Sequence, residues 1–164
     1  MSRRRYPLET LVRLRAHRTE LARQALLEKQ RVTRASGERC LRIEGEVDTL
    51  ARERGRQRSQ LLAPPPPGLD WPSALAQRER HIEYLAELAE AAQGRLQQAR
   101  TALAQAEQEQ DAARQAWFRT RARQEALEQR RDLWRREQRR AEARRDETAA
   151  EDLVSARHRP LAPS

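Results

Sequence analysis

The side chains able to do chemistry are sparse along this chain and lie far apart in the sequence. The three histidines, His17, His81 and His158, stand alone, and Cys40 is the single cysteine. A metal site needs several Cys or His at short spacing, and nucleophilic catalysis needs a base beside the nucleophile. Acids are abundant, but they recur at the spacing of a solvated helix surface. We therefore expect no enzyme active site, no cofactor and no metal.

The strongest chemical signal is a run of arginines around a tryptophan, where residues 127–140 read LEQRRDLWRREQRR. Arginine and tryptophan together are typical of interface hot spots, and the guanidinium group matches carboxylates and phosphates. Two interpretations of the tryptophan stay open: it anchors a partner, or it packs against Tyr6. We predict partner binding through Arg130, Arg131, Trp134, Arg135, Arg136, Arg139 and Arg140.

The charge balance also favours an anionic partner. The chain has 34 basic residues against 25 acids, for a formal net charge of +9. Most of the excess lies in residues 3–18 and 114–145, which hold eighteen arginines and six acids. A cluster of this size attracts nucleic acid, a membrane surface or an acidic protein.

The element that must position the arginine run is a long helix. Apolar residues recur in alternating steps of three and four from Leu75 to Trp134, and thirteen of the eighteen positions are apolar. A stripe with this period of 3.5 residues faces one partner helix, as in a coiled coil. A chain of this kind buries a stripe rather than a compact core.

An earlier helix carries a weaker stripe. It begins with Leu11, Leu14, Arg18, Leu21 and Ala25, and resumes out of phase at Cys40 with Ile43, Val47 and Leu50. Two successive four-residue steps reach Cys40, which predicts a stutter with local unwinding of the supercoil. The Cys40 thiol lies on the stripe and should be packed.

The two helices are separated by APPPPGLDWP, which no helix can continue through. Asp70 can cap the second helix, with Pro72 in its first turn. We predict a single domain with a first helix over 8–62, a proline-rich loop over 63–72, a second helix over 73–150 and a frayed tail over 151–164. The loop leaves an apolar spot formed by Leu62, Leu69 and Trp71.

A loop of this length between two amphipathic helices favours an antiparallel hairpin. The fold class is therefore all-α: a long two-helix antiparallel coiled-coil hairpin whose C-terminal helix overhangs the first. If the loop is centred near residue 67, position i should face position 135 minus i, so that Leu8 lies near Leu127. We expect a monomeric hairpin; a parallel homodimeric spacer is the alternative architecture.

No apolar run approaches the ~18 residues that a membrane span requires. Arginines interrupt the only stretch that resembles a signal peptide. We expect a cytoplasmic protein.

The order of these features resembles the FliJ/YscO family, the stalk proteins of the flagellar and injectisome type III secretion ATPase. YPLETLVRLR near the start and WFRTRARQEALEQRRDLWRREQRRAEARRDETAAED near the end carry the likeness. The proline tract departs from the family pattern. It tilts the interpretation toward an injectisome rather than a flagellar system.

The resemblance implies a two-helix coiled coil similar to the central stalk of rotary ATPases. It implies that the arginine-rich end enters the ring of the hexameric secretion ATPase, and that the chain also meets the cytoplasmic domain of the export gate and can bind secretion chaperones. The protein would lie at the cytoplasmic side of the inner-membrane export apparatus. The loop residues Leu62, Leu69 and Trp71 are the candidates for the gate contact. No small-molecule substrate is implied.

The alternative function is a basic coiled coil that binds RNA or DNA through phosphates. It predicts binding that weakens steeply as salt increases. Scarce aromatic residues and the lack of any nucleic-acid-binding module weigh against it.

Overall fold

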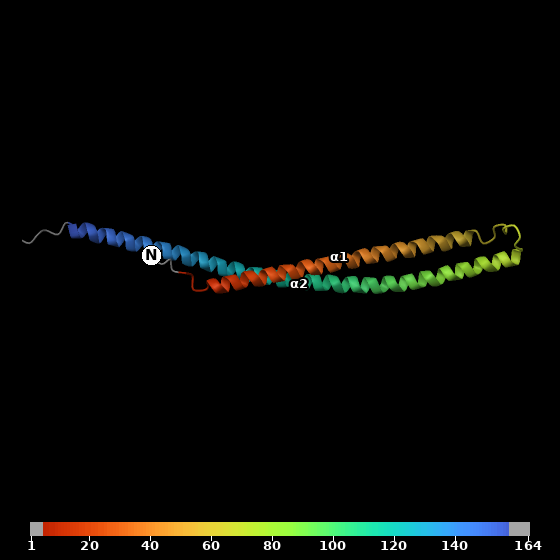
Figure 1. The fold of residues 1–164 in the computed structure, drawn as a ribbon, viewed down its shortest axis with the longest axis horizontal. Helices are drawn as coiled ribbons and strands as arrows, with labels where there is room; N and C mark the ends of the chain where they lie inside the picture. The colour runs from red at the N-terminus through yellow and green to blue at the C-terminus, as the bar shows by residue number, and fades with distance from the viewer. Residues whose placement is uncertain (1–4, 158–164) are drawn as a thin grey trace, which may run out of the picture. The chain divides into compact units, whose positions relative to one another are not determined.

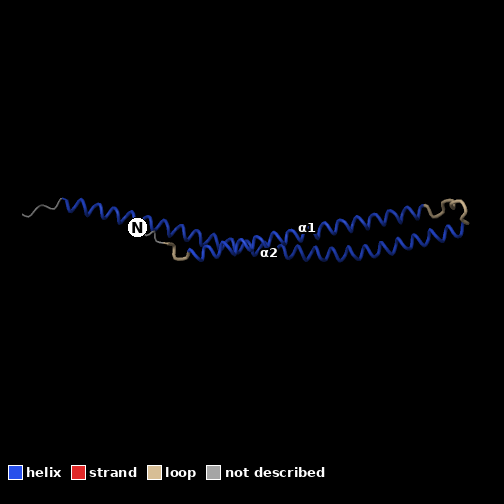
Figure 2. The backbone as a smooth tube through the Cα atoms, viewed as in Figure 1, coloured by secondary structure: helices blue, strands red, loops and turns tan. Residues whose placement is uncertain are grey.

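The structure, a computed structural model, describes residues 5–157 and places nearly all of them in two helices (Figures 1 and 2). Helix α1 spans Glu9–Ser59 and helix α2 spans Trp71–Arg157. No strand occurs within residues 5–157. The predicted all-α hairpin of two long helices is confirmed.

The helix ends differ from the predicted ones at both sides of the loop and at the C-terminus. Helix α1 ends at Ser59 rather than near 62, and α2 begins at Trp71 rather than 73. Residues 151–157, which we predicted to be frayed, are helical because no glycine or proline interrupts the segment before Pro160. The remainder of the predicted frayed tail, including His158, lies outside the described residues.

The chain divides into two compact units, each with a stretch of both helices. Unit 1 comprises residues 1–24 and 115–164, and unit 2 comprises residues 25–114. Unit 2 includes the loop, which Figure 2 shows as the break between the helices. The assignment of the whole chain to a single domain stays a prediction.

The apolar stripe predicted for α2 is confirmed. Each of its eighteen positions from Leu75 to Trp134 is buried or half-buried, and Ala92 is 0% exposed. The stripe also continues with two more half-buried residues, Gln138 and Ala141. From residue 142 to 157 every side chain is exposed, which agrees with a C-terminal stretch of α2 that extends past the packed part of α1.

The stripe predicted for the first half of α1 is wrong. Leu14 and Leu21 are 43% and 51% exposed, whereas Val12 and Leu26 are buried. The observed stripe is Val12, Arg15, Thr19, Ala22, Leu26, Lys29, Thr33, Ser36 and Cys40, and it continues in regular steps of three and four to Leu61. The predicted stutter is therefore absent from the described part of α1.

Polar side chains explain why the sequence suggested another stripe. In unit 2, the Thr33 hydroxyl lies within hydrogen-bond distance of two backbone oxygens, that of Lys29 on its own helix at 3.0 Å and that of Ala106 on α2 at 3.2 Å. The Lys29 ammonium pairs with Glu109, also on α2. These residues face the other helix because they find hydrogen-bond partners there, and a search for apolar periodicity cannot detect them.

The centre of unit 2 is a small apolar cluster of Cys40, Ile43, Leu96 and Ala99, flanked by Val47 and Leu103. Both helices contribute small and large side chains to this cluster, and four of the six buried residues of α2 are alanines. The predicted packing of the Cys40 thiol is confirmed, since only 5% of the residue is exposed.

Pairs across the hairpin fix which residues face each other. In unit 2, Arg95 meets Glu46 at 2.9 Å and Arg100 meets Glu44 at 2.8 Å. In unit 1, Arg131 meets Glu9 at 3.6 Å. Position i therefore faces roughly 140 minus i, five places from the predicted 135 minus i. The offset arises because the loop folds back over the first turns of α2, so α1 begins to face α2 only from about residue 78 onwards.

Candidate protein-binding surfaces

The predicted arginine–tryptophan site lies in unit 1, and the structure divides it into two groups. Arg131 and Trp134 belong to the half-buried stripe of α2 and face the start of α1. Arg131 and Arg135 approach the Glu9 carboxylate at 3.6 and 3.9 Å. The Tyr6 and Trp134 rings pack with centroids 5.4 Å apart and planes tilted by 56°. This geometry is typical of aromatic pairs.

We call Tyr6, Glu9, Arg131, Trp134 and Arg135 the N-terminal clasp. The clasp attaches the first turn of α1 to α2. The structure thus shows the packing of Trp134 on Tyr6, while its role as an anchor for a partner stays a prediction. Glu9 was not predicted as part of this cluster; its place in the first turn of α1, opposite an arginine run, was the available signal.

The remaining arginines of the predicted site are free of intramolecular ion pairs. Arg130, Arg136, Arg139 and Arg140 are exposed, and within residues 5–157 no carboxylate lies within 4.0 Å of any of them. Arg144 is also exposed, and it forms no ion pair with any residue of the described range. We call the four residues on one side of α2 the outer arginine row: Arg136, Arg139, Arg140 and Arg144.

Helical spacing places the members of the outer arginine row beside one another. Arg136, Arg140 and Arg144 follow in steps of four, and like charges at this spacing cost about 0.2–0.5 kcal/mol per pair. Within the described residues no carboxylate forms an ion pair with the row, although Asp132, Glu137, Glu142 and Glu147 lie one helical turn from its members. The row is therefore a surface on which an anionic partner would be stabilised.

An open groove runs beside the clasp, at the junction of the start of α1 and α2 in unit 1. Its acids are Glu9, which is held by arginines, and Glu142. Its basic lining exceeds its acidic lining, so the groove continues the positive surface of the row. It is lined by Arg5, Tyr6, Glu9, Thr10, Arg13, Trp134, Arg135, Gln138, Arg139 and Glu142.

An aromatic step precedes the arginine run in the same unit. Trp117 occupies the half-buried stripe, and its ring centroid lies 5.0 Å from that of the exposed Phe118. The Arg121 guanidinium lies over the Trp117 ring at 5.6 Å, within the range of a cation–π interaction. Trp117 is thus engaged within the chain, whereas Phe118 presents its ring to solvent.

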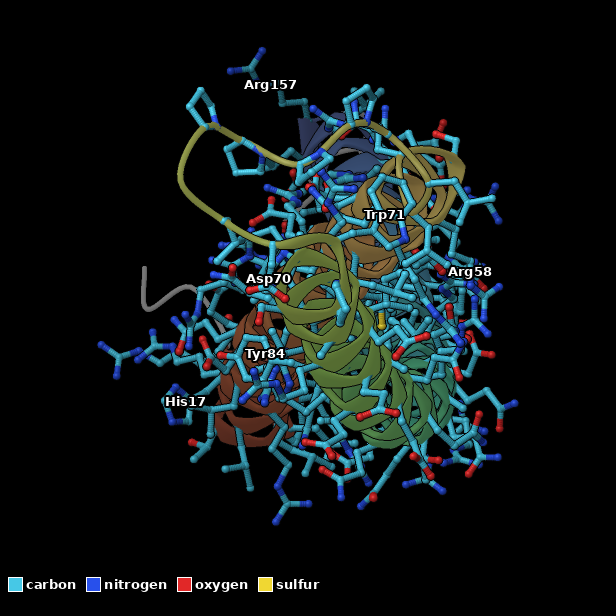
Figure 3. The ribbon with its side chains drawn as sticks, turned by 90° about the vertical axis from the view of Figure 1, so that its right-hand side faces the viewer. His17, Arg58, Asp70, Trp71, Tyr84 and Arg157 are labelled. Carbon is cyan, nitrogen blue, oxygen red and sulfur yellow. The ribbon has the colours of Figure 1, made fainter. Side chains whose placement is uncertain are left out.

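The second predicted site, at the loop in unit 2, is partly exposed. Leu62 and Trp71 are exposed and Leu69 is half-buried. Figure 3 looks onto this end and shows Asp70 and Trp71 where α2 begins. The Asp70 carboxylate accepts the Ser73 N–H at 3.2 Å, which confirms the predicted cap. Hydrogen bonds from Ser73 lower the pKa of Asp70.

Arg78 is the loop residue that sequence reasoning missed. Its guanidinium donates to three backbone oxygens, those of Leu61 at 3.0 Å, Ala63 at 2.6 Å and Pro64 at 3.2 Å. An arginine at a stripe position two helical turns into α2 was the available signal, because such a side chain needs acceptors nearby. It fixes the loop against α2.

Residues 5–157 contain no cluster of three or more metal-binding side chains. No helix in that range is long and apolar enough to cross a membrane. The arrangement is a helical hairpin with charged and apolar surfaces for other proteins.

Comparisons with known proteins place this hairpin in a family. A family model described as YscO-like protein matches residues 3–160. The chain belongs to the YscO-like family, a non-catalytic structural or coupling family related to type III secretion. It is a type III secretion component with protein partners.

A solved structure supports the fold. CT670 from Chlamydia trachomatis, described as a YscO homolog, matches with a TM-score of 0.74 over 95% of this chain and 96% of that chain. The sequences are 20% identical, so this likeness concerns the fold alone. No curated protein matches the chain.

Proposed function

We propose that this protein is the central stalk of a type III secretion export apparatus. In this role it inserts into the hexameric secretion ATPase, stimulates it and links it to the export gate. It acts at the cytoplasmic side of the inner membrane and also binds secretion chaperones. Membership of the YscO-like family and the helical hairpin support the proposal.

One observation carries the ATPase contact: the outer arginine row lies exposed on α2 in unit 1, and no carboxylate of the described residues forms an ion pair with it. Residues of the clasp hold the hairpin together and are therefore poor candidates for the contact surface. The contact thus moves from the whole predicted set of seven residues to its unpaired members, Arg130, Arg136, Arg139 and Arg140. The ring surface that meets them should be rich in carboxylates.

The test is a titration of the cognate ATPase with purified protein. We expect saturable stimulation near one chain per hexamer. The double variant Arg136→Glu/Arg140→Glu should raise the half-maximal concentration by at least about tenfold, because four units of charge change at one contact. Helicity should be unchanged, since neither arginine has an intramolecular ion pair.

The matched control is Arg119→Glu/Arg123→Glu. This pair has the same spacing on the same helix, is exposed, and makes no ion pair within the described chain. If both double variants raised the half-maximal concentration equally, the effect would reflect the overall charge of the protein rather than a defined contact at the outer arginine row. Absence of stimulation by the unaltered protein would refute the stalk proposal itself.

The gate contact is proposed for the apolar side chains of the loop. Changing Leu62, Leu69 and Trp71 to Ser should reduce secretion while ATPase stimulation is retained. Normal secretion by this variant would contradict the assignment of the gate contact.

A further inference from the structure

The loop in unit 2 contains four consecutive prolines, Pro64–Pro67, whose conformation is fixed before any partner arrives. Each proline ring holds φ near −65°, and each residue that precedes a proline is pushed toward an extended ψ. Both restrictions act together on Pro64, Pro65 and Pro66, which the structure shows as irregular, non-helical backbone. These restrictions favour the polyproline II conformation, a left-handed helix with three residues per turn, for the tract.

The prolines face outward from the protein. Pro64, Pro66 and Pro67 are exposed, and only Pro65 is half-buried. With three residues per turn, Pro64 and Pro67 lie on the same side of the segment. The side formed by Pro64 and Pro67 and the side formed by Pro66 are thus available to a partner, while the side formed by Pro65 packs against the protein.

Both ends of the tract are anchored. At the start, Arg78 donates to the backbone oxygens of Ala63 and Pro64. At the end, Gly68 has φ of +87°, and the Leu69 N–H donates to the Pro66 oxygen at 3.2 Å, which closes a turn of the type II pattern. The anchors lower the entropy that the loop would lose when a partner binds.

One acceptor in the middle of the tract is left unused. Proline has no N–H, so the tract offers only carbonyl groups to a partner. No donor within residues 5–157 reaches the Pro65 oxygen, although the oxygens on both sides of it are bonded. Proline-reading grooves combine aromatic walls, which contact the rings, with donors for such carbonyls.

We infer that Pro64–Pro67 is a binding site for a partner protein whose groove is lined by aromatic side chains and carries an N–H or O–H donor. Arg78 is a positioning residue for this site: it does not meet the partner but holds the tract in its bound conformation. The inference does not depend on the stalk proposal, since it concerns the loop alone and would hold for a chain that never entered an ATPase ring.

The test uses an SH3 domain as a probe, chosen because it binds the free peptide of residues 61–70. Its binding to the full chain is measured by isothermal titration calorimetry, because the chain's own tryptophans, including Trp71 beside the loop, would obscure a fluorescence signal from the groove. We expect the chain to bind at least as tightly as the peptide. Pro64→Ala/Pro67→Ala should weaken binding by roughly tenfold or more, because it removes the two rings on one side. Arg78→Ala should weaken it by about threefold through loss of preorganisation.

Pro72→Ala is the matched control, since this proline belongs to the first turn of α2 and not to the tract; its binding should be unchanged. Helicity of each variant is checked by circular dichroism. If the probe binds the peptide but not the full chain, the tract is inaccessible and the inference is wrong. Equal binding by the Pro64→Ala/Pro67→Ala variant would also overturn it, and equal binding by Arg78→Ala would remove the positioning role.

Discussion

Two adjacent leucines in unit 2 provide a direct test of the way the helices face each other. Leu26 is 7% exposed on the observed stripe of α1, and Leu27, the next residue, is 49% exposed. Truncating each to alanine changes the same atoms on the same helix. Only the surroundings differ, so the pair isolates the contribution of the interface.

The expected magnitudes follow from this difference in burial. Truncation of a buried leucine to alanine costs about 2–5 kcal/mol, and the narrow interface of two helices favours the lower end, about 2–3 kcal/mol for Leu26→Ala. Leu27→Ala leaves no enclosed cavity, and alanine is slightly the better helix former, so its cost should be about 1 kcal/mol or less.

Urea denaturation followed by circular dichroism at the helix band measures both losses. We expect Leu26→Ala to lower the midpoint clearly more than Leu27→Ala while the slope m stays the same, because the surface exposed on unfolding hardly changes. Equal losses, or a larger loss for Leu27→Ala, would refute the observed stripe of α1 in unit 2.

Three further perturbations test the packing, the cap and the clasp. Ala92 is fully buried between the helices, so Ala92→Leu should lower the free energy of unfolding, measured by urea denaturation, by about 1–3 kcal/mol. Ala91 lies on the exposed side of α2, so Ala91→Leu should be nearly neutral. Equal effects of the two substitutions would contradict close packing of the helices at Ala92. Hydrogen bonds from Ser73 lower the pKa of Asp70, so the Asp70 carboxylate stabilises the folded protein above its unfolded pKa, and this contribution is lost as pH falls through its folded pKa. Asp70→Asn should therefore make the melting temperature less sensitive to acid. An unchanged dependence of the melting temperature on pH would contradict this role. Trp134→Ala should speed hydrogen exchange in the first turns of α1 and leave the loop unaffected; unchanged exchange there would show that the clasp does not hold the N-terminus.

Several parts of the fold could be predicted from local patterns. The α2 stripe was readable because most of its positions are apolar and regularly spaced. The break between the helices was readable because four prolines exclude helix, and the cap because Asp70 stands directly before the helix. Each of these features depends on residues close together in the sequence.

The candidate site could be predicted only in part. The arginine run is visible in the sequence, but its division into clasp and outer row depends on which residues of α1 lie opposite. The predicted pairing was five places off, and at that offset Trp134 had no partner. Arg78 likewise gained its role only when the loop folded back over α2.

The sequence by itself therefore determined two long helices, the loop between them and the positive charge near one end of α2, because propensity, proline geometry and charge are local properties. The second half of the α1 stripe, from Cys40 onwards, was also predicted correctly. The tertiary structure alone decided the first half of the α1 stripe, the pairing of the helices and which arginines remain unpaired. The physical reason is that Lys29 and Thr33 become interface residues only when the other helix supplies hydrogen-bond partners, and no local pattern of apolar residues records those partners.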